Sequence, residues 1–236
     1  MVWCNNLKMP LQRQVFPDIE SLSQGFADFA ATALQNTLNR KPQATLVVPG
    51  GSTPRHYLPA LAKCKLPWDR ITVTLSDERW VDTSDDQSNE KLIKQYLLSH
   101  LPANTSFTGL KTAHDNPFDA VETLHQRLNS LPLPVSLTVL GLGEDGHIAS
   151  LFPGMNPDLL PARHCIAVAP PIAPSLRMSL SLEMLASSEQ IVLVVTGEKK
   201  RRLLDRISEK PDVELPIVWL MQHSQITITV FETDTV

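Results

Sequence analysis

The sequence predicts an α/β fold in which helices cover both faces of a mainly parallel sheet. Short runs rich in Val, Ile and Leu alternate with helical segments along the 236 residues. Near-continuous apolar strands of this kind are typical of parallel sheets whose two faces are both buried. Some of the runs end in glycines or polar clusters, as strands do where they open into loops.

The first element expected in the chain is a helix over Ile19–Leu38. Its apolar residues recur at intervals of three and four, which indicates one buried stripe, and Pro42 stops it. Further helices are expected after Pro54 and over residues 89–101, 118–131 and 199–207. The short apolar runs predict strands at 44–48, 71–75, 135–140, 165–169, 178–182, 191–195 and 226–231.

Composition limits the class of protein. Apolar residues make up 42% of the chain and charged residues 19%, which is typical of a soluble globular protein, and we expect a single domain over residues 1–236. The proline-rich segment 153–174 is interpreted as an ordered excursion over the active face, because its residues 165–169 are strand-like. The net charge of −4, without a block of like charge, gives no electrostatic reason to expect nucleic acid or a membrane as partner.

The cysteines and the N-terminal segment favour a cytoplasmic location. Cys4, Cys64 and Cys165 lie far apart, without the spacing of a zinc site or the density of a disulfide framework, so we expect reduced thiols. Residues 1–17 lack an apolar stretch of signal-peptide length, and no run is long enough to span a bilayer.

The segment from Gly141 to Gly154, GLGEDGHIASLFPG, is the strongest functional signal. It follows the predicted strand at 135–140 and holds His147 close to Asp145 in a glycine-rich loop. Histidine has the side-chain pKa nearest neutrality, so a histidine at the carboxyl end of a central strand is well placed to take and return a proton. We therefore predict that His147 is a catalytic base. A separation of two residues leaves open whether Asp145 points toward it.

A second loop, PGGSTP, links the strand at 44–48 to the following helix. Thr53 suits the N-cap and Pro54 the first turn, so backbone N–H groups and the hydroxyls of Ser52 and Thr53 could bind an anion there. The alternative is an ordinary strand-to-helix turn that needs glycines for its geometry. The loop lacks the spacing of nucleotide-binding motifs, so a nucleotide is not expected.

Charged residues follow two other predicted strands. Asp77 and Arg79 come directly after the strand at 71–75, where Arg79 could clamp a phosphate or carboxylate and Asp77 could hold a hydroxyl or orient a base. Lys199 and Lys200 lie in the first turn of a predicted helix, where cations are unfavourable unless one reaches an anionic ligand. The alternatives are a solvated loop and a solvated basic helix face. No His, Cys or carboxylate cluster has metal-ligand spacing.

Together these motifs resemble the 6-phosphogluconolactonases. PGGSTP, SDERWV followed by Ser88 and Asn89, GLGEDGHIASLFPG, a Pro-Pro pair followed by Arg177, and GEKK occur in that family's order, from about residue 20 onward. The resemblance implies hydrolysis of 6-phosphoglucono-1,5-lactone, the second step of the oxidative pentose phosphate pathway, without a metal or organic cofactor. It also implies a Rossmann-like three-layer fold, shared with glucosamine-6-phosphate deaminases and ribose-5-phosphate isomerases.

The resemblance also assigns roles. It makes His147 the base with Asp145 beside it, and it assigns to the substrate and its phosphate Gly51, Ser52, Thr53, Asp77, Arg79, Arg177 and Lys200. Donors for charge on the carbonyl oxygen are expected from backbone N–H groups within 141–146 or from Arg79. Ile148 departs from the threonine usual in lactonases, and the segment from PIVWL onward also departs from the family, so no function is assigned to it.

Two alternatives come from the same comparison. One is a sugar-phosphate deaminase or isomerase in which Asp77 is the base, although the sequence ASLFP argues against it. The other is a non-catalytic sensor of sugar phosphates, which the retained His147 argues against. Oligomeric state is left open.

Overall fold

The computed structural model describes residues 11–156, 163–171, 175–224 and 226–235, and the predicted parallel sheet forms its centre. Cys4 and parts of the proline-rich segment lie outside the described residues. Seven strands pair in parallel, in the order β1 (Leu11–Val15), β10 (Ile228–Thr233), β9 (Ile191–Thr196), β6 (Leu137–Gly141), β2 (Ala44–Val48), β3 (Ile71–Leu75) and β5 (Ser106–Thr108). The strands β2 and β9 are buried along their whole length, as a sheet covered on both faces requires.

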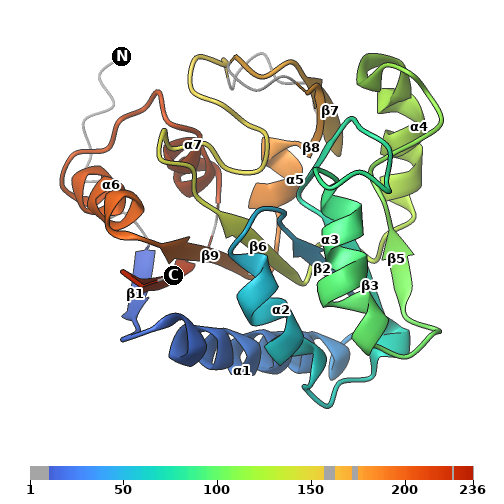
Figure 1. The fold of residues 1–236 in the computed structure, drawn as a ribbon, viewed down its shortest axis with the longest axis horizontal. Coiled ribbons are helices and arrows are strands. Elements are labelled where there is room, and N and C mark those ends of the chain that lie inside the picture. The colour runs from blue at the N-terminus through green and yellow to red at the C-terminus, as the bar shows by residue number, and fades with distance from the viewer. Residues whose placement is uncertain (1–10, 157–162, 172–174, 225, 236) are drawn as a thin grey trace.

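Helices lie on both sides of this sheet, which gives the α/β layering expected (Figure 1). On one side α1 (Ile19–Leu38) packs against α2 (Pro54–Ala62), which contacts α3 (Asn89–Tyr96). On the other side α5 (Leu182–Ala186) packs against α7 (Pro216–His223), while α6 (Glu198–Glu209) packs on β9 and β10. A further helix, α4 (Pro117–Asn129), packs on a smaller sheet. No helix in the described ranges is long and apolar enough to cross a membrane.

The helix α1 has the predicted bounds, and its first turn shows why it begins there. The Asp18 carboxylate accepts a hydrogen bond from the backbone N–H of Ser21 at 2.7 Å, which caps the N-terminus. The middle of the apolar stripe is buried and its Ile19 and Ala33 are partly buried, and the Phe26 ring centroid lies 4.4 Å from that of Tyr57 in α2. The periodicity in the sequence therefore identified the face that packs on the sheet.

A second sheet differs from the prediction. The strands β7 (Cys165–Val168) and β8 (Arg177–Leu180) do not join the parallel sheet; β8 lies between β7 and β4 (Asp77–Arg79) and runs antiparallel to both. The charged triplet Asp77–Arg79, which the sequence analysis placed directly after the strand at 71–75, therefore forms a strand of its own. The predicted strand 178–182 ends early because Ser181 caps α5, accepting the N–H of Met184 at 3.1 Å.

The edge strand β1, which the sequence analysis did not predict, is held by a buried carboxylate. Arg13 in β1 donates two hydrogen bonds to Glu232 in β10, at 2.7 and 2.6 Å, and Arg201 in α6 donates a third at 3.2 Å. Glu232 is 1% exposed, and such a buried charge is tolerated when it is paired and hydrogen-bonded. This ion cluster joins β1, β10 and the first turns of α6.

Candidate active site

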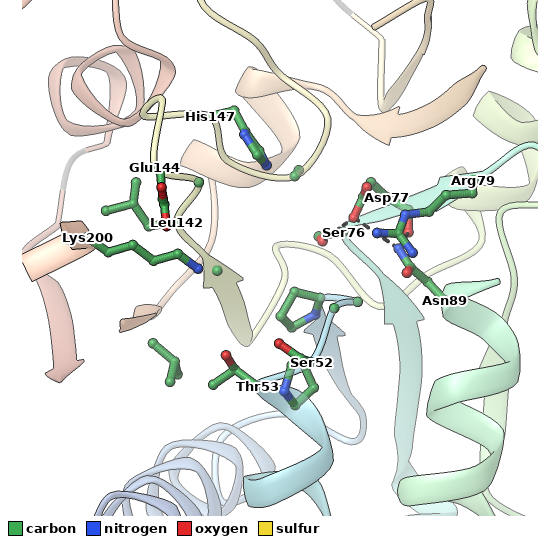
Figure 2. A pocket seen from close by; sticks show the side chains of 18 of the residues that line it. Ser52, Thr53, Ser76, Asp77, Arg79, Asn89, Leu142, Glu144, His147 and Lys200 are labelled. Atoms are coloured by element: carbon green, nitrogen blue, oxygen red, sulfur yellow. Dashed lines mark hydrogen bonds between the residues drawn. The ribbon is translucent and has the colours of Figure 1, made fainter. Parts of the chain in front are cut away.

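A cleft of about 400 Å³ lies where β2, β3, β6 and β9 reach their carboxyl ends, the usual ligand site of an open α/β sheet (Figure 2). The structure brings together in this cleft all but one of the residues that the sequence analysis selected, namely Gly51, Ser52, Thr53, Asp77, Arg79, His147, Arg177 and Lys200. Asp145 does not line the cleft, but it contacts His147 directly. Figure 2 shows His147 and Ser52 on opposite walls, with Lys200 and Arg79 entering from opposite sides.

The orientation that sequence spacing left open is resolved at His147. Its Nδ1 lies 2.6 Å from Oδ1 of Asp145, and the same oxygen accepts the backbone N–H of His147 at 3.1 Å. A carboxylate can only accept hydrogen bonds, so Nδ1 carries the proton and Nε2 is left as a proton acceptor. The imidazole therefore has the tautomer that a general base requires.

The loop that carries His147 is shaped by glycines. The N–H of Gly143 donates to the carbonyl of His147 at 2.9 Å, and the N–H of Gly146, a residue with φ of +86°, donates to the carbonyl of Gly143 at 3.1 Å. Both amides are therefore engaged within the loop. These two backbone N–H groups are therefore not free to act as the oxyanion donors that the sequence analysis expected. The other expected donor, the Arg79 guanidinium, lines the cleft.

Gly143→Ala is expected to lower kcat at least about tenfold, because misplacement of a catalytic group is costly. A Cβ at this position would lie 2.1 Å from Nδ1 of His147 and 2.5 Å from Oδ1 of Asp145, so the pair would have to shift. Steady-state kinetics combined with the melting temperature would separate this effect from unfolding. A correctly folded variant with the wild-type kcat would show that the pair moves without cost.

The PGGSTP loop adopts the predicted turn, with Thr53 at the N-cap position and Pro54 in the first turn, but without a side-chain cap hydrogen bond. Gly51 has φ of +96°, and a Cβ on Gly50 would lie 1.8 Å from the Asn89 side chain, so both glycines are required. Thr53 has helical backbone angles and makes no side-chain cap; its hydroxyl instead lies 3.1 Å from that of Thr196 at the end of β9. In the first turn of α2, Pro54 has no N–H, and the N–H groups of Arg55 and His56 donate to the carbonyls of Ser52 and Thr53 at 3.3 and 3.1 Å. The hydroxyls of Ser52 and Thr53 are therefore the donors that we expect to meet an anion at this end of α2.

Two arginines face one another in the small sheet. The register of β4 and β8 pairs Arg79 with Arg177, and like charges directly opposite one another are unfavourable. Within the described chain, the Nε of each guanidinium is buried without a hydrogen-bond partner. Burial, followed by the charge of Arg79, lowers the pKa of Arg177. Two adjacent cations with unsatisfied donors fit an anionic ligand.

Asp77 is largely occupied by protein donors. It accepts hydrogen bonds from Ser150 Oγ at 2.7 Å, Ser76 Oγ at 3.1 Å and Asn89 Nδ2 at 3.3 Å, and its Oδ2 lies 3.7 Å from Nη1 of Arg177. Asp77 is only 6% exposed. It lines the cleft as predicted, but most of its bonding capacity organises the site.

Glu78 has a structural role that the sequence analysis missed. Its buried carboxylate accepts the backbone N–H groups of Arg79, Asn89 and Glu90 at 2.7 to 2.8 Å, and so helps to cap α3 from the neighbouring strand β4. Burial raises the pKa of Glu78, and these donors oppose that shift. Ser88 and Asn89 follow SDERWV in the motif that the sequence analysis used. The sequence does not indicate that Glu78 accepts their hydrogen bonds.

The two lysines of α6 have different surroundings. Lys200 lines the cleft, whereas the Lys199 side chain is 81% exposed and lies 3.5 Å from Glu144. Glu144 and Asn89 also line the cleft, and neither was assigned a role from sequence. Among the described residues, no group of three or more His, Cys, Asp or Glu side chains could hold a metal ion.

Comparison with known proteins gives consistent matches. The family model described as glucosamine-6-phosphate isomerases/6-phosphogluconolactonase matches residues 17–229. A 6-phosphogluconolactonase of Pseudomonas aeruginosa is 36% identical over 208 residues, which cover 85% of this chain and 87% of that protein. The crystal structure of a 6-phosphogluconolactonase from Shewanella baltica superposes with a TM-score of 0.89 at 32% identity, covering 94% of this chain and 97% of that one.

A monomeric glucosamine-6-phosphate deaminase also superposes, with a TM-score of 0.80 over 94% of this chain and 97% of that chain. At 21% identity this likeness shows the fold alone. The fold predicted from sequence is therefore confirmed.

Proposed function

Because the chain belongs to the family of glucosamine-6-phosphate isomerases and 6-phosphogluconolactonases, we propose that it hydrolyses 6-phospho-D-glucono-1,5-lactone to 6-phospho-D-gluconate. The observation that carries the proposal is the His147 imidazole, whose Nδ1 is held by Asp145 so that Nε2 is the proton acceptor. The reaction is the second step of the oxidative pentose phosphate pathway.

The chemistry needs one base that later acts as an acid. Nε2 of His147 takes a proton from water as the water oxygen bonds to the C1 carbonyl carbon. The imidazolium then gives that proton to the ring oxygen as the C1–O5 bond breaks, and the new carboxylic acid loses its remaining proton to solvent. Asp145 stabilises the imidazolium between the two steps. We assign Arg79 to the carbonyl oxygen, where negative charge develops.

The phosphate is assigned to cleft residues that come from distant parts of the chain. The hydroxyls of Ser52 and Thr53 lie at the N-terminus of α2, with Gly51 making the turn, while Arg177 and Lys200 supply positive charge. A dianion bound there satisfies the buried donor of Arg177, which has no partner among the described residues. A protein with a net negative charge thereby binds an anion through a local positive site.

A deaminase or isomerase function is not favoured. It requires Asp77 to move protons to and from a substrate, whereas Asp77 accepts hydrogen bonds from Ser150, Ser76 and Asn89. A role as a non-catalytic sensor of sugar phosphates does not explain the oriented pair of His147 and Asp145, and it is not favoured either. We propose a cytoplasmic location without a nucleic-acid partner, in keeping with the free thiols of Cys64 and Cys165 and the net charge of −4.

The test is lactone hydrolysis by the purified protein. The lactone would be generated in the assay, and 6-phosphogluconate formation measured against the spontaneous reaction in the same buffer, with glucosamine-6-phosphate as a parallel substrate. We expect accelerated hydrolysis of the lactone and no release of ammonia from the amino sugar. Hydrolysis no faster than the spontaneous reaction, or release of ammonia, would overturn the proposal.

Incubation with EDTA is expected to leave this activity unchanged. The proposed reaction uses His147 and Asp145 for proton transfer, and this pair alone is too few ligands for a typical catalytic metal. The rate would be compared before chelation, after it, and after addition of Mg²⁺ or Zn²⁺. Loss of activity that a divalent ion restores would contradict the metal-free mechanism.

A further inference from the structure

The small antiparallel sheet contributes side chains of β4 and β8 to the cleft. The register of β4 and β8 pairs Asp77 with Ser179 and Arg79 with Arg177. Residues two apart on a strand share a face, so all four side chains lie on one side of this sheet. Asp77, Arg79 and Arg177 line the cleft, which identifies this as its inner face.

Ser150 fastens the histidine loop to that face. Its Oγ donates to Oδ2 of Asp77 at 2.7 Å, and its backbone N–H donates to Oγ of Ser179 at 3.2 Å. Both partners belong to one cross-strand pair, and Ser150 is fully buried. The residue that makes both bonds lies only three positions after His147.

The backbone between His147 and Ser150 is under strain. Ala149 has φ of +48°, the one non-glycine residue with a positive φ in the described chain. Such a conformation is unfavourable for a residue with a side chain and persists only where the surroundings hold it. The flanking Ile148 and Leu151 are fully buried and form an isolated bridge, and Ser150 adds the polar contacts. The turn is therefore held from both sides.

Asp77 is shared between the loop and the arginines. The same Oδ2 that accepts the Ser150 hydroxyl lies 3.7 Å from Nη1 of Arg177, while Oδ1 is held by Ser76 Oγ at 3.1 Å. One buried carboxylate thus contacts the group assigned to the phosphate and the segment that carries the base. It fixes the position of each relative to the other.

We propose that Ser150 is a positioning residue, which sets the distance between the phosphate anchor at Arg177 and the base His147 by tying the histidine loop to Asp77. This inference rests on the proposed lactonase function. A lactone held by its phosphate presents C1 at one fixed place, so the base must be held in register with the anchor. A lactone without a phosphate is not anchored in this way and can follow a displaced histidine.

The test compares Ser150→Ala on two substrates. For 6-phosphogluconolactone we expect kcat to fall about 10- to 100-fold with KM within about twofold of wild type, because a misplaced base costs chemistry more than binding. For unphosphorylated gluconolactone the fall in kcat should be at least about fivefold smaller. Ser150→Cys, which keeps a weak donor, should lie between wild type and Ser150→Ala.

Ser188→Ala is the matched control. Ser188 is also a buried serine, with its Oγ 2.7 Å from Thr138 Oγ1 and 2.8 Å from the Leu185 carbonyl, but it does not line the cleft. It should lower the melting temperature and leave kcat for both substrates unchanged. Equal losses of kcat on both lactones in Ser150→Ala, or a kcat within twofold of wild type, would overturn the positioning role. If the wild-type protein hydrolysed neither lactone, the proposed function itself would fail.

Discussion

Replacing His147 by glutamine is expected to lower kcat for the phosphorylated lactone by about 10²- to 10⁴-fold, the usual contribution of a general base. Glutamine can still donate a hydrogen bond to Asp145, but it cannot take a proton from water. Because a base acts mainly in the transition state, the affinity for 6-phosphogluconate should remain near that of the wild type. Stopped assays for turnover and calorimetry for product binding would measure the two effects separately.

His100→Gln gives the matched control, since His100 is exposed and does not line the cleft. It should have the wild-type kcat. A His147→Gln or His147→Ala enzyme with the wild-type kcat would remove His147 from the mechanism. A variant that lost turnover and product binding together would point to damage of the cleft instead of loss of a base.

Lys200→Ala is expected to raise KM for the phosphorylated lactone and to affect unphosphorylated gluconolactone much less. A charge-assisted hydrogen bond contributes roughly 1.5–3 kcal/mol, so selectivity between the two lactones should fall about ten- to a hundredfold. Arg177→Ala should act in the same direction, because its guanidinium is assigned to the same phosphate. The measurement is kcat/KM for both substrates in each variant.

Lys199 provides the control within the same helical turn. Its side chain is 81% exposed and absent from the cleft lining, so Lys199→Ala should leave the selectivity unchanged although it removes the same charge. Equal losses on both lactones in Lys200→Ala would mean that Lys200 acts on the lactone ring or on the fold. Equal effects of the two lysine variants would mean that only the overall charge matters.

Local sequence patterns predicted the elements that are buried through their own apolar residues. The bounds of α1, β2 and β3 follow from periodicity and from β-branched runs, because burial of these segments needs no particular distant residue. The strand β1 was missed because Gln12, Arg13 and Gln14 make an edge strand polar and only partly buried. The helix α7 was missed because it is buried over six successive residues and so lacks an amphipathic stripe.

The site was predictable in its members and less so in its geometry. Glycine-rich and polar loops after parallel strands must meet at one sheet edge, which is why cleft residues could be selected from sequence. Asp77–Arg79 pairs with a strand that lies about a hundred residues later in the chain. Asp77 accepts its hydrogen bond from Ser150, which lies 73 residues later. No local pattern encodes such contacts. For the same reason Thr53 was correctly placed at the N-cap position of α2, but the contact of its hydroxyl with Thr196 in place of a cap bond was not predicted.

The contact between β1 and β10 also affects how the protein is made. Arg13 meets Glu232, which lies 219 residues further along the chain, so β1 has no partner strand until synthesis has nearly passed that point. Until then β9 presents an unpaired edge, and Arg13 and Arg201 lack their shared carboxylate. Long-range parallel pairing is intrinsically slow to form. A nascent chain that stops before β10 therefore leaves the sheet open, and an interrupted product is exposed to aggregation and proteolysis before it can accumulate.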